Sequence, residues 1–223
     1  MGIKRASTLM VIQTDQSKKW AGEFGDEYTD RNPQNSNEMD ALYIKNFGIT
    51  RTELNKEFLK DIPKDSSILE VGSNNGAQIL GIQDLGFNNL TGIEISRYAI
   101  EKAKKLTKNI DFLQASALDL PFKDNCFDLV FTAGVLIHIN PNDLPKVIDE
   151  MYRTSKRYIW GCEYFSESCQ EINYRGNQNM LWKTNFLKLF LDRHPDLRLI
   201  REKKFRYLDS DNVDIMYLLE KVK

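Results

Sequence analysis

An apolar run that ends in a glycine-bounded turn is the feature that most constrains this 223-residue chain. Residues 68–76 read I-L-E-V-G-S-N-N-G, and residues 77–85 continue as a predicted helix whose N-terminus faces the turn. Gly72 and Gly76 let the backbone turn tightly and approach a ligand without an intervening Cβ atom. Glu94 ends a second apolar run, where paired ribose hydroxyls can donate to its carboxylate. This order predicts a nucleotide-binding α/β fold; a strand-turn-helix with a surface glutamate is the alternative.

Two positions near this turn discriminate between classes of nucleotide. Asn74 stands where a dinucleotide-binding fingerprint has glycine, and Glu70 lies inside the first strand, where such a domain usually keeps an apolar residue. The acid before the turn, the spacing E-x-G-x-x-x-G and the acid after the second strand resemble the class I S-adenosylmethionine-dependent methyltransferases. The resemblance implies S-adenosylmethionine as cofactor, with Glu70 orienting the turn and the methionine end of the cofactor. Asn74 replaces the family's middle glycine, and asparagine tolerates unusual backbone angles.

Two further segments extend the resemblance along the chain. Residues 111–122 resemble the family's third strand and adenine loop, where the Ser116 hydroxyl could accept from the adenine amino group and the Ala117 amide could donate to the ring. Residues 127–139 resemble the fourth strand and its exit, so residues 132–134 are expected beneath the sulfonium of the cofactor. The expected cofactor-binding residues are Glu70, Gly72, Ser73, Asn74, Gly76, Glu94, Ile95, Ser116, Ala117, Ala133 and Gly134.

The alternation of predicted strands and helices favours one α/β domain over residues 1–223. Residues 1–60 are expected to form a helical lid or cap, and residues 61–223 a Rossmann-like core. The resemblance implies a doubly wound, mostly parallel seven-stranded sheet that ends in an antiparallel hairpin. The other predicted elements are helices within 40–59 and 140–154, a helix over 184–194 with Thr184 as its cap, a fifth strand over 157–163, and hairpin strands over 197–205 and 213–220.

Composition and charge limit the partners of the chain. A formal net charge of -1 gives no global attraction to nucleic acid or to an anionic membrane, and no stretch has the length of a membrane span. Cys126, Cys162 and Cys169 lack paired or metal-like spacing, and with only two histidines no metal site is expected. The cysteines suggest a reducing compartment, and residues 1–6 match neither a signal peptide nor a myristoylation signal. We therefore expect a cytoplasmic protein, and its oligomeric state stays open.

Two segments outside the cofactor motifs are candidates for substrate recognition. The first, residues 20–32, is aromatic, glycine-bearing and charged, and forms either a lid or an N-terminal helix that covers the sheet. The second follows the fifth strand within residues 163–183. Loops at the carboxyl ends of strands are where open α/β sheets bind ligands. The candidate substrate-binding residues are Tyr28, Arg31, Tyr174 and Arg175.

Together, these segments resemble the methylases associated with pseudaminic acid biosynthesis, a branch of the class I methyltransferases linked to bacterial surface sugars. The resemblance rests on W-A-G-E-F-G-D-E-Y-T-D-R-N at residues 20–32 and on the later Y-R-G and W-K motifs. It implies a nonulosonic acid, its nucleotide-activated form or a related precursor as acceptor. An acidic sugar needs a fixed cation, and Arg175 and Arg31 are the candidates because guanidinium pairs bidentately with carboxylate or phosphate.

Methyl transfer from a sulfonium to oxygen or nitrogen requires alignment of the nucleophile and removal of a proton. His138 is the first candidate base, because its ordinary pKa is near neutrality and the exit of the fourth strand points into the cleft. A structural or cofactor-edge role is the alternative for His138. Glu163 and Tyr164, at the end of the fifth strand, are the other candidate catalytic residues.

Other functions are weighed against this one. Nucleic-acid amino-methylases usually carry an acid or asparagine, two prolines and an aromatic residue at the fourth-strand exit, where this chain has T-A-G-V at residues 132–135. No cysteine follows a proline, as a cytosine carbon-methylase would require. Both absences favour a small polar acceptor. A nicotinamide-dependent oxidoreductase, which needs a hydride-transfer set such as Tyr-x-x-x-Lys, and a cofactor-binding module without catalysis stay open as alternatives.

Overall fold

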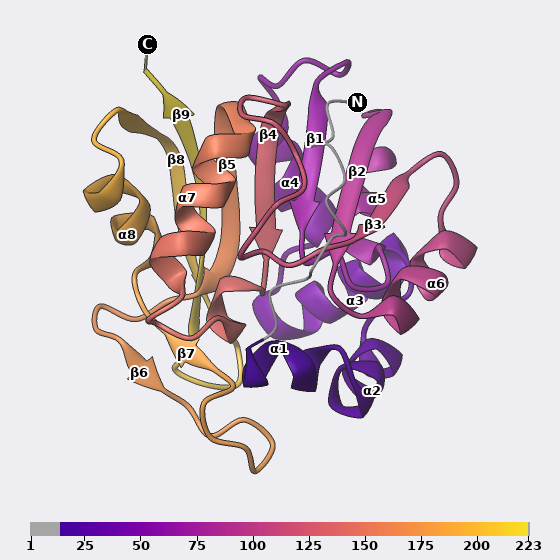
Figure 1. Cartoon of the computed structure of the whole chain (residues 1–223), viewed down its shortest axis with the longest axis vertical. Coiled ribbons are helices and arrows are strands. Elements are labelled where there is room, and N and C mark those ends of the chain that lie inside the picture. Colours follow the sequence, from indigo (N-terminus) through magenta and orange to yellow (C-terminus); the bar gives the residue numbers. More distant parts are fainter. Residues whose placement is uncertain (1–13, 223) are drawn as a thin grey trace.

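The computed structural model describes residues 14–222, and its centre is a seven-stranded sheet. The strand order is β3-β2-β1-β4-β5-β9-β8; the first five strands run parallel, and β9 and β8 run antiparallel (Figure 1). The strands are β1 (Ser67–Val71), β2 (Asn89–Glu94), β3 (Asp111–Gln114), β4 (Phe127–Ala133), β5 (Ser155–Tyr164), β8 (Leu197–Arg206) and β9 (Val213–Lys221). The predicted mostly parallel sheet with a terminal hairpin is confirmed.

Burial and chain order explain where this sheet binds ligands. In β1 every side chain from Ile68 to Val71 is buried, so the strand reads as a near-continuous apolar run around Glu70. The chain then builds the sheet in two directions, with β2 and β3 on one side of β1 and with β4 and β5 on the other. Open α/β sheets bind ligands beyond the carboxyl ends of the strands at such a reversal. The topology therefore directs a ligand to the ends of β1 and β4.

Helices cover both faces of the sheet. They are α3 (Ser36–Phe47), α4 (Arg51–Leu59), α5 (Ala77–Gln83), α6 (Arg97–Leu106), η1 (Leu136–His138), α7 (Leu144–Thr154) and α8 (Phe186–Arg193). One core cluster joins α7 and α8 to the sheet, and a second joins α3, α4 and α5 to it. No helix within residues 14–222 is long and apolar enough to cross a membrane.

The N-terminal segment forms two short helices, α1 (Asp15–Trp20) and α2 (Glu23–Arg31), beyond the end toward which the β4 arrow points (Figure 1). The ring centroids of Phe24 on α2 and Tyr174 in the segment that follows β5 are 6.1 Å apart. The two candidate substrate segments, far apart in sequence, are therefore neighbours. Residues 1–13 of the expected lid region lie outside the described residues. These include residues 1–6, which were compared with targeting signals.

Two local features differ from the sequence expectation. The segment after β5 contains a small antiparallel pair, β6 (Gln170–Glu171) and β7 (Trp182–Lys183), which had not been predicted. Thr184 was expected to cap the next helix, and this was wrong: the Asn185 side chain caps α8 by accepting from the Lys188 N–H at 3.0 Å. Thr184 instead continues the extended chain in an isolated bridge with Phe165.

Candidate active site

A cavity of about 420 Å³ lies at the carboxyl ends of β1, β2, β4 and β5, with side chains of α1 and α2 in its wall. Its lining includes most of the residues expected from sequence, namely Glu70, Gly72, Ser73, Asn74, Glu94, Ile95, Ser116, Ala117, Ala133, Gly134, His138, Glu163, Tyr164, Tyr28 and Tyr174. Gly76, Arg31 and Arg175 are outside the lining. The fold therefore brings the cofactor motifs and most of the candidate catalytic and substrate residues to one cavity.

The turn after β1 forms part of the cavity wall. Gly72 and Asn74 have φ angles of 76° and 46°, so asparagine does occupy the left-handed region at the middle of the turn. A Cβ atom at Gly72 would lie 2.7 Å from a methyl group of Val135, so only glycine fits there. A Cβ atom at Gly76 would lie 3.0 Å from the Phe112 ring. Gly76 therefore closes the turn against the protein interior, which is why it does not line the cavity.

Three backbone N–H groups hold the Glu94 carboxylate at the end of β2. Its Oε1 atom accepts from Ile95 and Ser96 at 2.6 and 2.9 Å, and its Oε2 atom accepts from Asn74 at 2.9 Å. Burial raises the pKa of Glu94, although these hydrogen bonds act to lower it. A carboxylate offers about four lone-pair sites, so one is left for a donor in the cavity.

Several buried oxygens on the β1 side of the cavity have no hydrogen-bond partner in the part of the chain that the structure describes. They are Glu70 Oε2, Ser73 Oγ, Asn74 Oδ1 and Gln78 Oε1, and all four residues line the cavity. Burial raises the pKa of Glu70 well above its usual range, although the Arg51 charge acts to lower it. A buried acceptor without a partner costs free energy, so this wall suits a ligand that donates hydrogen bonds.

The loop after β3 contributes another wall through Ser116 and Ala117. Ser116 Oγ accepts from the N–H of Leu118 at 3.2 Å. The hydroxyl oxygen that was expected to accept from an adenine is therefore partly engaged by the loop itself, although its O–H can still donate.

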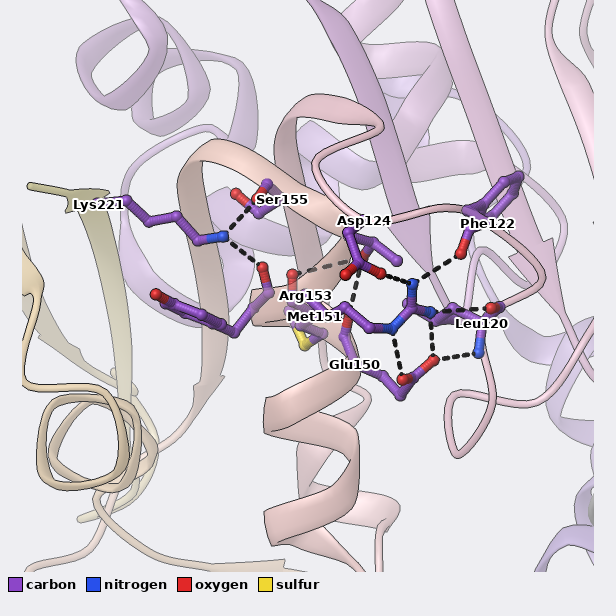
Figure 2. Close-up of polar contacts among 10 residues, drawn as sticks. Leu120, Phe122, Asp124, Glu150, Met151, Arg153, Ser155 and Lys221 are labelled. Carbon is purple, nitrogen blue, oxygen red and sulfur yellow. Dashed lines mark hydrogen bonds and ion pairs between the residues drawn. The ribbon is translucent and has the colours of Figure 1, made fainter. Parts of the chain in front are cut away.

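Arg153, in the last turn of α7, holds the remainder of this loop in place (Figure 2). Its guanidinium donates to the carbonyl oxygens of Phe122 and Leu120 at 2.7 and 3.1 Å and to the Asp124 carboxylate at 2.8 Å. Glu150 completes the clamp, because it accepts from Arg153 at 2.7 Å and from the Leu120 N–H at 2.7 Å. The position of the β3 loop thus depends on a charged pair on α7.

His138 lies beneath an aromatic cover that both substrate segments supply. Its ring centroid is 4.5 Å from that of Trp20, 6.1 Å from that of Tyr28 and 5.2 Å from that of Tyr174. Burial lowers the pKa of His138 to about 4, although a hydrogen bond to the Met180 carbonyl acts to raise it. His138 is therefore neutral at pH 7, which favours a positioning role over that of a base that titrates near neutrality.

Glu163, at the end of β5, is a buried carboxyl whose pKa lies near neutrality. Its Oε1 atom accepts from the N–H of Val135 at 3.2 Å, and its Oε2 atom accepts from the N–H of Ile137 at 3.4 Å. Burial raises its pKa to about 7, although these hydrogen bonds act to lower it. A carboxyl in this range can hold or release a proton at physiological pH. The neighbouring Tyr164 has a raised pKa for the same reason, burial.

Asp214, on β9, lines the cavity although it was not singled out from the sequence. It lies opposite Tyr164 on β5, and its buried Oδ1 atom has no partner within the described residues. Burial raises its pKa to about 8 even though Arg51 and Lys183 act to lower it. Its sequence signal was an acid inside an apolar strand, V-D-I-M-Y at residues 213–217.

Arg51 is a second residue that the sequence did not reveal, and it lies behind the cavity wall with only 2% of its surface exposed. Its Nε atom donates to Asn55 at 3.0 Å, and its Nη1 atom donates to the Tyr43 hydroxyl at 2.6 Å and to Cys162 Sγ at 2.9 Å. Tyr43 and Cys162 line the cavity, whereas Arg51 does not. The buried guanidinium therefore ties α4 to β5 beside the site.

The two arginines proposed to bind an anion lie apart from the cavity lining. Arg31 is 3.5 Å from Glu27 and borders a separate, shallow pocket. Arg175 is exposed in a left-handed conformation with φ of 52°, and its guanidinium carbon is 6.0 Å from the centroid of the Tyr174 ring. Their role in binding an acidic substrate stays a prediction; each has a chain neighbour in the lining, Asn32 beside Arg31 and Tyr174 beside Arg175.

A Tyr-x-x-x-Lys spacing does occur at Tyr152, in the last turn of α7, and Lys156, at the start of β5, although it was not found in this region from the sequence. The Tyr152 hydroxyl donates to Asp196 at 2.5 Å, and Lys156 pairs with Asp128 at 3.3 Å. Neither residue lines the cavity. The spacing therefore does not supply a hydride-transfer pair at this site.

Comparison with known proteins finds methyltransferases among the proteins to which this chain is similar. Residues 69–158 match the family model described as a methyltransferase domain. The ubiquinone/menaquinone biosynthesis C-methyltransferase UbiE of Rickettsia bellii is 36% identical over 125 residues, which cover 51% of this chain and 49% of the relative. The 2-phytyl-1,4-naphtoquinone methyltransferase of a Nostoc species is 36% identical over 73 residues, 30% of this chain and 31% of that protein. The chain spans about half the length of the first of these curated relatives and about a third of the second.

Solved structures extend the likeness to the whole fold. A Pyrococcus horikoshii protein superposes with a TM-score of 0.66 at 19% identity, and the match covers 87% of this chain and 98% of that protein. The 1,6-didemethyltoxoflavin-N1-methyltransferase of Burkholderia thailandensis, solved with S-adenosylhomocysteine, superposes with a TM-score of 0.69 at 10% identity and covers 99% of this chain and 98% of its own. At these identities the likeness concerns the fold.

The sheet has the Rossmann-like fold of the class I S-adenosylmethionine-dependent methyltransferases, and residues 69–158 match a methyltransferase domain. S-adenosylmethionine is the cofactor of this class, and the unpartnered oxygens of the β1 wall fit it. The cofactor carries hydrogen-bond donors on its ammonium group, its ribose and its adenine, and that wall presents acceptors without partners. The residues that would hold it are Glu70, Ser73, Asn74, Gln78, Glu94, Ser116 and Ala117.

Proposed function

We propose that this chain transfers a methyl group from S-adenosylmethionine to an oxygen or nitrogen atom of a small polar acceptor. The observation that carries the proposal is the shared cavity, in which the acceptor-rich turn and Glu94 lie on one side and Glu163, Tyr164 and His138 lie on the other. When bound, the cofactor supplies a methyl group activated by a positively charged sulfur. The protein must then align an acceptor and take up its proton.

The residues of the chain divide this work between them. Trp20 and Tyr28 of the N-terminal helices cover His138 and exclude water from that end of the cavity. Neutral His138 shapes the pocket, and the Glu163 carboxyl, with a pKa near 7, is the group suited to hold the acceptor's proton. Burial of Tyr164 keeps its hydroxyl protonated and able to donate.

The acceptor is a separate part of the proposal, because the residues on its side of the cavity lie outside the matched range 69–158. Glu163, Tyr174 and Asp214 all follow that range. The family model therefore does not cover these residues on the acceptor side of the cavity. The sequence resemblance favours a bacterial surface-sugar precursor, either a nonulosonic acid or a nucleotide-activated sugar. An acidic form of it would have to reach Arg175 or Arg31 outside the lining, because the described lining holds no arginine or lysine.

Incubation with isotopically methyl-labelled S-adenosylmethionine and a polar metabolite extract tests the proposal. Mass spectrometry should detect at least one small molecule that gains the label, with the label bound to oxygen or nitrogen. The Glu94→Ala variant, at the same protein and cofactor concentration, should produce much less of it. Absence of any labelled small molecule, with S-adenosylhomocysteine binding intact, would favour a cofactor-binding module without catalysis.

A further inference from the structure

We propose that Glu163 and Asp214 form a recognition site for a protonated amine on the acceptor, at the end of the β5–β9 ladder. The inference rests on the proposed methyl transfer and adds the chemical class of the acceptor to it.

The antiparallel pairing of β5 with β9 brings these two acids to one end of the sheet. Tyr164 lies opposite Asp214, and Glu163 lies opposite Ile215. Paired residues share a face of the sheet, so Glu163 and Asp214 project to opposite faces of the ladder. Both nevertheless line the same cavity, which therefore wraps around the end of the ladder. A ligand group placed there meets a carboxyl from each face.

Asp214 is buried in the cavity wall, and one of its two carboxyl oxygens has no partner in the described part of the chain, although Tyr207 hydrogen-bonds to the side chain. Asp214 is 6% exposed, and its Oδ1 atom has no hydrogen-bond partner within the described residues. Glu163 is 1% exposed, its hydrogen bonds from Val135 and Ile137 are long, at 3.2 and 3.4 Å, and Thr132 and Leu136 also act on its carboxyl. Asp214 therefore keeps a free acceptor for a ligand donor, and an ammonium group offers three donors that the two carboxyls can share.

The charges around the cavity as a whole favour a cation. The lining carries five carboxyl side chains and, among residues 14–222, no lysine or arginine; the five are Glu70, Glu94, Asp143, Glu163 and Asp214. Arg51 faces Asp214 from behind the wall, but its hydrogen bonds go to Asn55, Tyr43 and Cys162. Lys183 also faces Asp214.

These two cations only partly compensate the acids. The pKa of Asp214 stays raised to about 8, and that of Glu163 to about 7, in both cases chiefly by burial. A bound ammonium group would supply the missing positive charge. The ring cluster of Trp20, Tyr28 and Tyr174 lines the same cavity, and aromatic faces attract alkylammonium groups as well. An acidic acceptor would meet repulsion here.

Three probes that share a phenyl ring and a two-carbon chain but differ in the charged or neutral group at the end test this inference. They are 2-phenylethylamine, 2-phenylethanol and phenylacetate, each titrated near pH 7.5 into protein saturated with S-adenosylhomocysteine. The variants are Asp214→Asn and Glu163→Gln, which preserve shape and remove the charge. Asp209→Asn, in the exposed turn before β9, is the matched control. The dissociation constant of S-adenosylhomocysteine reports first whether each variant keeps a folded site.

We expect the amine to bind at least about tenfold more tightly than the alcohol, since charge-assisted hydrogen bonds exceed neutral ones, and phenylacetate to bind weakest. Asp214→Asn or Glu163→Gln should remove most of that preference, and Asp209→Asn should not. Equal binding of the three probes, or no binding of the amine, would overturn the proposal. Tightest binding of phenylacetate that Arg175→Ala abolishes would overturn it in favour of an acidic acceptor.

Two further titrations distinguish an amine site on the acceptor side from a site for the cofactor's own charge. The sulfonium of the cofactor is also a cation, so each variant is titrated with S-adenosylmethionine and with S-adenosylhomocysteine. Loss of the preference for the charged cofactor, with unchanged amine binding, would assign the two acids to the cofactor and overturn the inference. Failure of the wild-type protein to bind S-adenosylhomocysteine would instead contradict the proposed function itself.

Discussion

The Nδ1 atom of His138 lies 2.7 Å from the carbonyl oxygen of Met180. A carbonyl can only accept, so Nδ1 carries the proton and Nε2 is left as an acceptor in the neutral ring. The contact fixes both the tautomer and the orientation of the imidazole. It also joins the exit of β4 to the segment after β5, across the cavity that both border.

This relationship predicts that His138 stays uncharged over the physiological range. Burial holds its pKa at about 4, below its usual value, so the ring should gain a proton only in acid. Nuclear magnetic resonance of the histidine Cε1–H signals reports this directly, and a His194→Asn variant assigns the two histidines of the chain. A titration midpoint of His138 near its ordinary value of about 6.5 would restore it as a candidate base.

Glu94→Ala is expected to weaken S-adenosylhomocysteine binding by about tenfold or more. The variant removes a charged acceptor, and hydrogen bonds to charged groups are worth roughly 1.5 to 3 kcal/mol. It also leaves the N–H groups of Asn74, Ile95 and Ser96 without their acceptor, so some loss of stability should accompany it. Isothermal titration measures the affinity, with Glu101→Ala on the exposed side of α6 as the control. Unchanged affinity would remove Glu94 from the cofactor site.

Arg153→Leu should weaken cofactor binding without touching the cofactor. The side chain holds the β3 loop through the carbonyl oxygens of Leu120 and Phe122, so its loss frees a loop that forms part of the cavity wall. The free energy of unfolding should fall by roughly 2 kcal/mol as those charge-assisted hydrogen bonds are lost. Chemical denaturation and S-adenosylhomocysteine titration measure the two effects. Arg157→Leu is the control, because it removes an exposed ion pair with Glu220. Equal effects of the two variants would contradict a specific role of Arg153 in holding the β3 loop.

The pH dependence of stability should reveal Glu163 in the protein without ligand. Its pKa rises from 4.5 to about 7 on folding, so the folded state binds more protons than the unfolded state between these values. The stability that the protonated carboxyl contributes is fully present below the pKa of the unfolded state, 4.5, and it is lost as the pH rises toward the folded-state pKa of about 7. Relative to Glu163→Gln, the free energy of unfolding of the wild-type protein should fall by about 3 kcal/mol across that pH window. A pH-independent difference between the two proteins would contradict a raised pKa.

The cofactor half of the site was predictable from sequence because it depends on local chain geometry. The turn at residues 72–76 and the acid at Glu94 follow directly from strand-turn-helix order, and both line or close the cavity as expected. Their positions relative to one another are fixed by the pairing of β1 with β2, which the apolar runs already indicated.

The acceptor half was less predictable because it depends on contacts between distant segments. Asp214 enters the cavity only because β9 pairs with β5, and Arg51 reaches Cys162 across 111 positions of sequence. From the sequence His138 was a candidate base or a structural residue, and its burial, which lowers its pKa to about 4, favours the structural role. The arginines chosen for charge lie outside the lining, because a guanidinium is easier to solvate at the surface than to bury without a partner.

Paired isothermal titrations with S-adenosylhomocysteine and with NAD test the central claim most directly. The claim is that the cavity lined in part by α1 and α2 is a methyltransferase cofactor site. We expect one S-adenosylhomocysteine per chain to bind the wild-type protein and no detectable binding of NAD, because Asn74 and Glu70 break the dinucleotide pattern. Binding of NAD with no binding of S-adenosylhomocysteine would contradict the account.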